Sequence, residues 1–564
     1  MRKQTKIILI LILFVGYILR SYNSFWDMGF NLHPDERAII MTVLDLSLPD
    51  SFESFFSVES TLNPHFFAYG NMPFYVLKIA ASAYAVIDPT IDSYYTIAPL
   101  ARAIVVLVEL CILLTLFFLT RKLFSEQLAL IATTIYAIAV FPIQVAHFFT
   151  VDPFMSLFIL LTLTSLISMY RHLSYKNSLA VGLFFGLALA SKISALPLIF
   201  PISITVICII YKHQKRLSIA HLLRTGMKMF PYILTLGLSA VGIYAITQPY
   251  VILDFQSFLA QSKIQSQMTE SAFTFPYTLQ YVGKIPYWYE VKNIFLWGFG
   301  PVATVLMVIG IAVTIKDLRN ASHQIEKMIM FSFVGIYFLI VGNFAVGWMR
   351  YMLPLYPFFA IFAAIGISTI FRKLSNNATV QKSIVALMVC LLLLWPASFL
   401  HIYTMPHTRL AATDWIIKNI PEGSTLAVEH WDDRLPLHGG ERYTTVDLPL
   451  YDPDTPFKWN TINHTLDTTD YIIIASNRLY TPLQKMTTCE QLPPDKCYPT
   501  TAAYYRDLFN GSRGFEKIKE FSVYPTIPYT NIHINDQGAD ESFTVYDHPK
   551  IFIFKKNDSI PHSR

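Results

Sequence analysis

Residues 100–120 read LARAIVVLVELCILLTLFFLT, and this stretch decides the class of fold. It is almost entirely apolar, and about 20 such residues are enough for one helix to cross a bilayer. Ten further stretches have the same character, near residues 7–24, 127–147, 153–171, 178–192, 193–211, 229–248, 295–315, 328–346, 351–371 and 383–402. The sequence therefore predicts an α-helical polytopic membrane protein with about eleven transmembrane helices.

The composition of the whole chain agrees with this class. Of its 564 residues 54 % are hydrophobic and only 14 % are charged, and its mean hydropathy is +0.44. Globular proteins carry roughly 25 % charged residues. These values exclude an ordinary cytosolic enzyme, a disordered protein and a nucleic-acid-binding protein. Five cysteines exclude a disulfide scaffold and a cysteine-rich metal module.

Basic residues gather in alternate loops between the predicted spans. They are Arg2, Lys3, Lys6, Arg121, Lys122, Arg171, Lys176, Lys212, Lys215, Arg216, Arg224, Lys228, Lys316, Arg319, Lys327, Arg372, Lys373 and Lys382. Lysine and arginine concentrate in cytoplasmic loops, so we expect a multi-pass protein of the cell membrane whose N-terminus is cytoplasmic. We expect the first stretch to be a span and not a cleaved signal peptide, because no small-x-small cleavage site follows it. The net charge of +5 then needs no nucleic-acid partner.

The composition changes near residue 403, where apolar stretches end and Asp, Thr, Pro and Tyr become frequent. We interpret residues 1–402 as the membrane domain and residues 403–564 as a soluble α/β domain, which an odd number of spans places outside the cell. We expect helices over 410–420 and 502–509, and strands over 425–428, 471–475, 521–524, 543–546 and 551–554. A disulfide between Cys489 and Cys497 would suit an exported domain, and the sequence leaves its formation open. Residues 72–87 are shorter and more polar than a span, and we expect a helix at the membrane surface.

Two acidic sites lie on the predicted outer side. In the first outer loop, Pro34, Asp35 and Glu36 have the pattern of a helix start. An ionised carboxylate at the mouth of a membrane cavity is also a suitable general base. Asp152 lies at the outer end of the fourth predicted span, where it either caps a helix or joins Asp35 in one cavity.

Three cations stand on the outer side, where the topology rule predicts few: Arg102, Lys192 and Arg350. Each can extend to lipid headgroups, and together they can bind a phosphate at the membrane surface. The second outer loop, residues 250–294, is rich in aromatic residues such as Tyr281 and Tyr287. Its rings form either an interfacial belt or a wall for a sugar or an acceptor.

Motifs of nucleotide hydrolysis and zinc peptidases are missing from the sequence, which contains no GxxxxGK[ST], HExxH, GxSxG or paired CxxC. An enzyme that works on the outer face therefore needs a donor already present in the membrane. We expect no cofactor and no essential metal.

The outer-loop motifs resemble those of the membrane glycosyltransferases with the GT-C fold. His33-Pro34-Asp35-Glu36 is similar to the acidic-pair motif of the protein O-mannosyltransferase branch, which includes the lipid A aminoarabinose transferases. Further stretches that look like bacterial members of this branch are Asn63-Pro64-His65-Phe66-Phe67, Tyr69-Gly70, Arg102, Thr150-Val151-Asp152-Pro153, Ala190-Ser191-Lys192, Gln248-Pro249-Tyr250, Gln280-Tyr281 and Arg350-Tyr351. The resemblance covers the membrane part, about 400 residues, whereas residues 403–564 do not look like the β-trefoil domain of eukaryotic protein mannosyltransferases.

The resemblance implies an inverting transfer of a sugar from a polyprenyl-phosphate donor to an acceptor hydroxyl on the extracytoplasmic face. It implies that Asp35 is the base, that Glu36 supports it and that Arg102 assists at the lipid phosphate. We expect Lys192 and Arg350 to join Arg102 there, and Asp152 to orient the acceptor or the base. We assign His33, His65, Tyr281 and Tyr287 to substrate binding.

Other functions fit the same sequence features. The acceptor can be a protein, a lipid or a glycan. A transporter or flippase for lipid-linked sugars would also carry ionisable residues near the membrane. A non-catalytic scaffold would use only its outer domain to bind a partner.

Overall fold

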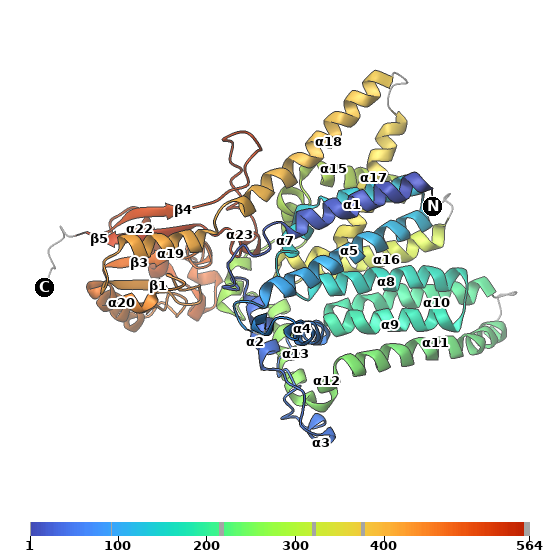
Figure 1. Cartoon of the computed structure of the whole chain (residues 1–564), viewed down its shortest axis with the longest axis horizontal. Coiled ribbons are helices and arrows are strands. Elements are labelled where there is room, and N and C mark those ends of the chain that lie inside the picture. Colours follow the sequence, from blue (N-terminus) through green and yellow to red (C-terminus); the bar gives the residue numbers. More distant parts are fainter. Residues whose placement is uncertain (1, 92, 214–218, 318–322, 374–377, 558–564) are drawn as a thin grey trace.

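The computed structural model describes residues 2–91, 93–213, 219–317, 323–373 and 378–557 (Figure 1). A helical bundle forms one end of the molecule, and a domain built on a β-sheet forms the other. The N-terminus lies at the end of the bundle that is far from the sheet (Figure 1).

Eight helices of the described ranges are long and apolar enough to cross a membrane. They are α1 (Lys3–Ser21), α5 (Ala98–Leu123), α8 (Asp152–Arg171), α10 (Ile199–His213) with the 3-10 turn η2 (Ile193–Leu198) before it, α11 (Ile219–Thr247), α16 (Gln324–Gly342), α17 (Tyr356–Lys373) with η5 (Met349–Leu355) before it, and α18 (Ala378–Leu400). Apolar side chains on their outer faces, such as Ile10, Leu107 and Leu238, are more than half exposed. A lipid environment accounts for this exposure, whereas water does not. The chain is a membrane protein.

The prediction of eleven spans is thus confirmed for eight, and the other three stretches are helical but shorter. Helices α9 (Tyr175–Ser191) and α15 (Pro301–Asp317) have 17 residues each. At 1.5 Å per residue they reach about 26 Å, less than the ~30 Å of a hydrocarbon core. The stretch predicted over 127–147 is divided into α6 (Glu126–Ala137) and α7 (Val140–Val145).

The division between α6 and α7 has a physical cause in Pro142. Proline is tolerated in the first turn of a helix but not inside it, and the break at Ile138 and Ala139 puts Pro142 in the first turn of α7. The break leaves carbonyl groups of α6 without helical partners. Arg20 donates to the carbonyl oxygens of Tyr136 and Ala137 at 3.1 and 2.7 Å.

Small residues let the two helices α15 and α17 approach closely. A Cβ atom on Gly310 would collide with the carbonyl oxygen of Phe362, and one on Gly366 with that of Leu306. Such small-residue contacts are typical of helix packing in membranes. They hold α15 against α17, and η5, which carries Arg350, directly precedes α17.

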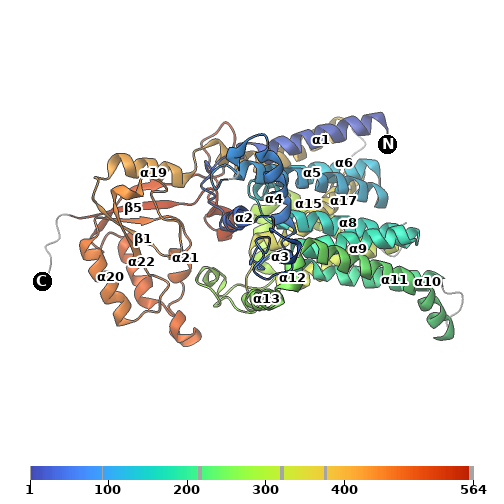
Figure 2. The ribbon, with the colours of Figure 1, turned by 60° about the horizontal axis from the view of Figure 1, so that its bottom comes forward.

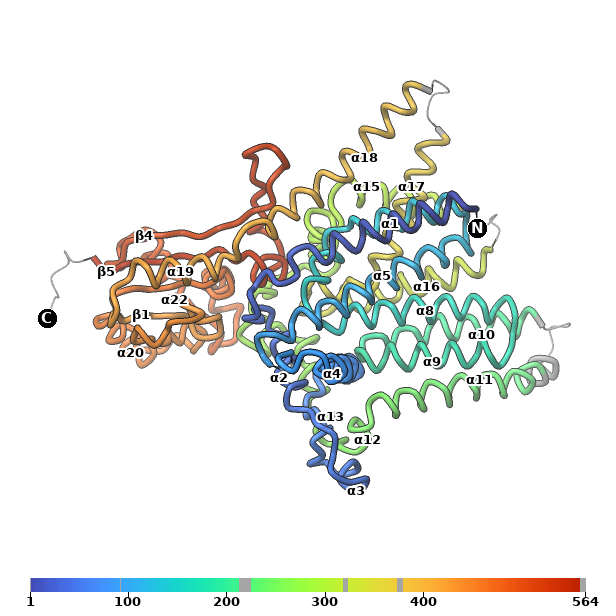
Figure 3. Tube along the Cα trace, viewed as in Figure 1, coloured from blue at the N-terminus to red at the C-terminus, as the bar shows by residue number. Residues whose placement is uncertain are grey.

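Shorter elements lie at the end of the bundle that faces the sheet domain (Figures 1 and 3). They are α2 (Pro34–Asp45), α3 (Phe52–Phe55), α4 (Met72–Ala85), η1 (Pro89–Ile91), α12 (Pro249–Leu253), α13 (Phe255–Glu270), η3 (Pro276–Tyr281), α14 (Trp288–Asn293) and the π-turn η4 (Ile294–Gly298). Helix α4 is seen end-on in Figure 3, so it runs across the direction of the bundle. The predicted helix over 72–87 exists, and its direction suits a position at the membrane surface.

The C-terminal domain contains a five-stranded mixed sheet with strand order β2-β1-β3-β5-β4. The strands are β1 (Thr425–Glu429), β2 (Thr444–Leu448), β3 (Tyr471–Ile474), β4 (Phe515–Phe521) and β5 (Ile551–Lys556). Strands β2, β1 and β3 are parallel, and β5 is antiparallel to both β3 and β4. Other elements of the domain are η6 (His401–Thr404), α19 (Thr408–Asn419), η7 (Gly440–Arg442), α20 (Pro456–Thr468), α21 (Tyr480–Leu483), η8 (Cys489–Gln491), η9 (Pro494–Lys496), α22 (Pro499–Phe509) and α23 (Glu541–Thr544).

Alternation along the strands gives the sheet two buried faces (Figure 2). Leu426 and Ile473 lie in one apolar cluster with Ile416 of α19. Ala427 and Ile472 lie in another cluster, with residues of α20 and α22. The domain therefore has three layers, with α19 on one face and α20 and α22 on the other.

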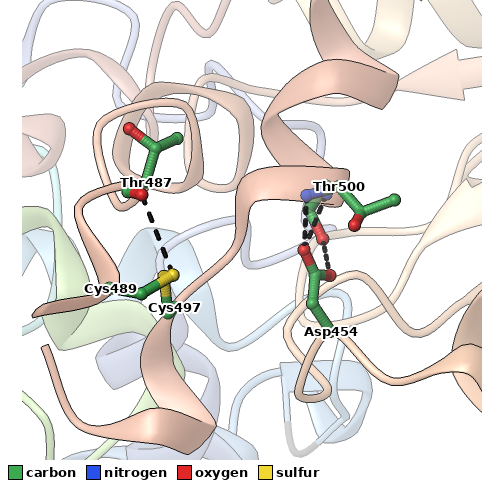
Figure 4. The surroundings of a disulfide bond; sticks show 6 residues. Asp454, Thr487, Cys489, Cys497 and Thr500 are labelled. Atoms are coloured by element: carbon green, nitrogen blue, oxygen red, sulfur yellow. Dashed lines mark hydrogen bonds between the residues drawn. A yellow bond between two sulfur atoms is a disulfide. The ribbon is translucent and has the colours of Figure 1, made fainter.

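Most of the predicted elements of this domain are present, and one is wrong. The predicted strand over 543–546 overlaps the short helix α23, which Asp540 caps by accepting from the Ser542 N–H at 2.9 Å. The predicted strand over 521–524 meets β4 only at Phe521, where that strand ends. Cys489 and Cys497 form the disulfide that the sequence left open, close to the Asp454 side chain that binds the start of α22 (Figure 4).

Candidate active site

A cavity of about 220 Å³, here named the central cavity, lies where the bundle meets the C-terminal domain. Its lining includes two acids, three cations and five aromatic residues, which come from both parts of the chain. The charged residues are Asp35, Glu541, Lys192, Arg350 and Arg478, and the aromatic residues are Tyr69, Tyr277, Trp348, Tyr351 and Tyr546. Three of the ten predicted site residues, Asp35, Lys192 and Arg350, thus share one cavity.

Asp35 occupies the first turn of α2, as its sequence pattern indicates. His33 is the N-cap, and its Nδ1 atom accepts a hydrogen bond from the Asp35 N–H at 3.2 Å. Because the ring of His33 performs the capping, the carboxylate of Asp35 is free to face the cavity. Burial, together with the nearby charge of Arg350, holds the pKa of His33 well below its usual value, which keeps Nδ1 unprotonated as the cap requires.

The carboxylate of Asp35 has two partners. Tyr69 donates its hydroxyl to Oδ1 at 2.8 Å, and Arg350 forms an ion pair with Oδ2. The Asp35 side chain is 18 % exposed, so it remains accessible from the cavity. The guanidinium of Arg350 also lies 5.2 Å from the ring centroid of Trp348. Asp35 is therefore an oriented carboxylate beside a cation.

Lys192 lies on another wall of the central cavity, at the end of α9. Its Nζ atom contacts Asp152 Oδ1 at 2.7 Å and lies above the rings of Tyr69 and Tyr351. Asp152 is 1 % exposed and lies behind Lys192, outside the cavity lining. A Cβ atom on Gly70 would collide with the backbone of Ala190, so this close approach keeps Tyr69 beside Lys192.

Arg102 lies away from the position that the sequence predicted for it. It is fully buried and does not line the central cavity. Its five N–H groups are engaged by Glu36 at 2.9 and 2.6 Å, by Asp27 at 3.0 and 2.7 Å, and by the carbonyl oxygen of Ser24 at 2.7 Å. It has no donor left for a phosphate. Arg102 and Glu36 hold α2 in place, and neither contacts the cavity.

Both predicted substrate-binding histidines lie elsewhere. His33 packs between the rings of Phe148 and Tyr546 at 4.6 and 4.1 Å and is 3 % exposed. His65 stands on the surface with a side chain that is 52 % exposed, at 3.5 Å from Asp254. Neither lines the central cavity.

The two predicted tyrosines of the second outer loop also serve other contacts. Tyr281 donates its hydroxyl to Asp540 of the C-terminal domain at 3.0 Å, and Tyr287 donates to the carbonyl oxygen of Leu339 at 3.2 Å. The loop does contribute an aromatic wall, but through Tyr277. The aromatic pattern thus identified the loop and not the residue that faces the cavity.

Three lining residues from the C-terminal domain escaped the sequence analysis: Arg478, Glu541 and Tyr546. Arg478 follows β3, and nothing in its local sequence signals a site. Glu541 stands in an Asp-Glu pair like that of the first outer loop, which is a weak signal in an acidic domain. Among the described residues, no group of three His, Cys, Asp or Glu side chains is arranged to hold a metal ion.

A second, larger space of about 630 Å³ adjoins the central cavity and is here named the apolar groove. The two share Ala68, Lys192, Gln265 and Tyr351 in their linings. The remaining lining is mostly apolar and comes mainly from η2, α10, α13, α16 and the residues just after α16. It includes Leu196, Pro197, Ile199, Phe200, Ile340, Val341 and Phe344. Lys192 thus stands at the junction of a polar cavity and an apolar groove.

Comparison with known proteins gives a family match for part of the chain and a fold for most of it. Residues 98–249 match the model of the dolichyl-phosphate-mannose-protein mannosyltransferase family. This match includes Arg102, Asp152 and Lys192. No curated protein sequence is significantly similar to the chain.

Solved structures resemble the chain along most of its length. The oligosaccharyltransferase of Archaeoglobus fulgidus tethered to an acceptor peptide is 12 % identical, with a TM-score of 0.52 over 98 % of this chain and 89 % of that one. The apo form of that enzyme has a TM-score of 0.51 at 12 % identity, over 94 % of this chain and 74 % of that one. ArnT from Cupriavidus metallidurans bound to undecaprenyl phosphate has a TM-score of 0.42 at 13 % identity, over 84 % of this chain and 94 % of that one. The resemblance predicted from the sequence is confirmed: the chain has the fold of the GT-C membrane glycosyltransferases, and its residues 98–249 match the model of the dolichyl-phosphate-mannose-protein mannosyltransferase family.

Proposed function

We propose that the chain is an inverting glycosyltransferase, which moves a sugar from a polyprenyl-phosphate donor to an acceptor hydroxyl on the extracytoplasmic face. One observation carries this proposal: the cavity that contains Asp35 opens into an apolar groove, with Lys192 at their junction. A lipid-linked sugar phosphate has the same order of parts, namely an apolar chain, a phosphate and a sugar.

The donor would lie with its prenyl chain in the apolar groove and its phosphate beside Lys192. Arg350 lines the cavity as a second cation and can form paired hydrogen bonds with phosphate oxygens. Asp152 positions the Lys192 ammonium through their contact of 2.7 Å. Lys192 and Arg350 therefore take the phosphate-binding role, while Arg102 positions α2 from behind.

The reaction is one displacement at the anomeric carbon. The acceptor oxygen forms the new bond to this carbon as the bond to the phosphate oxygen breaks on the opposite face. Asp35 takes the proton of the acceptor hydroxyl, and the bonding electron pair leaves with the lipid phosphate. Fixed positive charge at the leaving group is often the largest catalytic contribution. Tyr69 orients the base through its 2.8 Å hydrogen bond.

The distribution of charge along the bundle supports the proposed orientation. Arg171 lies at the end of α8 far from the central cavity, where it contacts Glu326 at 3.0 Å and the carbonyl oxygen of Lys122 at 3.1 Å. This end carries basic loops, as cytoplasmic ends do, and the cavity lies at the other end. Lys215, Arg216 and Arg319 lie outside the described residues.

The test uses the purified protein in detergent with radiolabelled polyprenyl-phosphate sugars. Loss of label from the lipid is followed in the wild type and in Asp35→Asn. Asp45→Asn is the matched control, because Asp45 is an exposed residue at the other end of the same helix. We expect Asp35→Asn to lower the rate by about 10²-fold or more, since it removes the general base, and Asp45→Asn to equal the wild type.

Two outcomes would contradict the proposal. Equal rates in the wild type and Asp35→Asn would remove Asp35 from the mechanism. No loss of label from any sugar, with a cell-envelope extract as acceptor source, would favour the transporter or scaffold functions.

A further inference from the structure

An ion pair from the C-terminal domain forms one wall of the central cavity. Arg478 Nε donates to Glu541 Oε1 at 2.8 Å, and the two side chains are 13 % and 9 % exposed. The second carboxylate oxygen, Oε2, is buried and has no hydrogen-bond partner among the described residues. Within the described part of the chain, Arg478 Nη2 has no hydrogen-bond partner, whereas Nη1 donates to the carbonyl oxygen of Trp431 at 3.4 Å. Both residues line the central cavity, and their ion pair leaves one carboxylate oxygen and one guanidinium nitrogen without a hydrogen-bond partner among the described residues.

Glu541 is held rigidly in this position. The preceding Asp540 accepts hydrogen bonds from the hydroxyl groups of Tyr281 and Tyr289 at 3.0 and 2.7 Å, and its N–H donates to Asn293 at 3.0 Å. These three partners belong to the second outer loop of the membrane domain. A buried carboxylate oxygen without a partner is costly, and a ligand that donates a hydrogen bond to it would remove this cost.

The wall formed by Arg478 and Glu541 lies apart from the residues that connect the cavity to the apolar groove, so we assign it to the acceptor. Lys192 and Tyr351 connect the cavity to the apolar groove, which is the donor side of the proposed function. We propose, on the basis of that function, that Arg478 and Glu541 bind the acceptor substrate and that this acceptor is a glycan, recognised through two neighbouring hydroxyl groups.

A vicinal diol fits the Arg478–Glu541 pair. One hydroxyl donates to Oε2 of Glu541, and its neighbour accepts from Nη2 of Arg478. The rings of Tyr277, Trp348 and Tyr546 line the same cavity and can pack against the apolar face of a sugar. Burial raises the pKa of Glu541 to about 7, against the opposing charge of Arg478, which is consistent with a carboxylate that lacks a second hydrogen bond.

A peptide acceptor fits this wall less well. An extended peptide gains its affinity from a row of backbone partners, such as the edge of a sheet. None of the described residues that line the cavity belongs to a strand of the C-terminal sheet. A serine or threonine side chain would also engage only one half of the donor and acceptor pair.

The first experiment measures binding and needs no donor. Methyl hexopyranosides, their monodeoxy analogues and a serine-containing peptide are titrated onto the full chain in detergent, with saturation-transfer NMR as the readout. We expect at least one glycoside to bind. The analogue that lacks one of its two recognised hydroxyl groups should bind at least about tenfold more weakly, because a hydrogen bond to a charged group is lost. Glu541→Gln and Arg478→Lys should weaken binding of the parent glycoside by a similar factor.

The second experiment measures how a labelled donor partitions between the glycoside and water. Transfer and hydrolysis are counted together, and their ratio is the readout. We expect Glu541→Gln and Arg478→Lys to lower this ratio by about tenfold. Glu516→Gln and Arg506→Gln are the matched controls, because both residues are exposed on the same domain, and they should keep the ratio of the wild type.

The outcomes separate this inference from the proposed function. Loss of donor turnover in the wild type would contradict the proposed function, while the binding experiment would still test the acceptor site. Binding of the peptide and of no glycoside would overturn the glycan assignment. An unchanged ratio of transfer to hydrolysis in folded Glu541→Gln and Arg478→Lys would overturn the acceptor role of the pair.

Discussion

Arg102 is the residue that ties the first outer loop to the bundle. Its guanidinium joins the loop after α1, through Asp27, to helix α2, through Glu36, and all three side chains are fully buried. A buried charge that loses its partner is strongly destabilising. The orientation of Asp35, the next residue to Glu36, therefore depends on a cation that never meets the cavity.

Arg102→Gln tests this positioning role. The substitution leaves Asp27 and Glu36 buried without a full counter-charge, and we expect it to lower the free energy of unfolding by about 3–5 kcal/mol. Thermal unfolding of the detergent-solubilised protein measures the loss. Arg121→Gln is the control, because that side chain is 37 % exposed and lies 3.6 Å from Glu126. Normal stability of Arg102→Gln with a raised donor KM would instead support a phosphate-binding role.

Helix α23 is a short element with a large effect on the site, because it carries Glu541 into the central cavity. Its cap, Asp540, is bound by two tyrosines of the second outer loop, Tyr281 and Tyr289. Burial raises the pKa of Asp540, and the hydroxyl groups of the tyrosines stabilise its charged form. The aromatic loop thus acts on the site through an element of the other domain.

Tyr281→Phe tests this coupling between elements. It removes one hydrogen bond to a carboxylate, which stabilises the contact by about 1.5–3 kcal/mol. We expect faster hydrogen exchange in residues 536–548 and a lower transfer rate. Tyr529→Phe is the control, since Tyr529 is fully exposed. Unchanged exchange with a raised acceptor KM would show that Tyr281 touches substrate, as the sequence predicted.

Elements were predictable from the sequence where one strong local pattern decides them. Apolar length located α5 and α8, and a short apolar run located β3 and β5. The run at Phe543–Tyr546 misled, because a segment buried on all sides reads the same as a helix or as a strand. Phe543 packs against Phe399 and Trp297, which lie far away in the sequence, so the local pattern does not reveal these contacts.

The residues of the candidate site also divide into those that the sequence predicted and those that it did not. Asp35 was predicted because it stands in an acidic pair of the first outer loop that resembles the GT-C motif, and Lys192 and Arg350 because cations are rare on the outer side. Arg478 and Glu541 were not, since their role arises only when the C-terminal domain packs on the bundle. Arg102 has the same outer-side pattern as Lys192, but all of its donors are engaged by Glu36, Asp27 and Ser24, whereas Lys192 lines the central cavity.

At the scale of the whole molecule, a buried histidine joins the C-terminal domain to the bundle. His548 contacts Asp536 at 2.8 Å and Asp547 at 2.5 Å. Asp547 in turn accepts from Tyr403 at 2.8 Å and from Gln144 of α7 at 3.0 Å. Burial lowers the pKa of His548, but the two carboxylates outweigh it and raise the pKa to about 10. The cation therefore stabilises the segment that carries Glu541 and Tyr546 into the cavity.

This contact predicts how stability depends on pH. A group whose pKa is raised on folding stabilises the folded state fully below its unfolded pKa, about 6.5 for histidine, and this contribution is lost as the pH rises through the folded value. We expect the melting temperature of the wild type to decrease as the pH rises from about 6.5 to 10. His548→Gln should be less stable than the wild type at the lower pH and equally stable at the upper pH. His464→Gln is the control, because His464 is exposed on the same domain. Parallel pH profiles for His548→Gln and the wild type would show that His548 is uncharged in the folded state and that its charge does not stabilise the contact between the domain and the bundle.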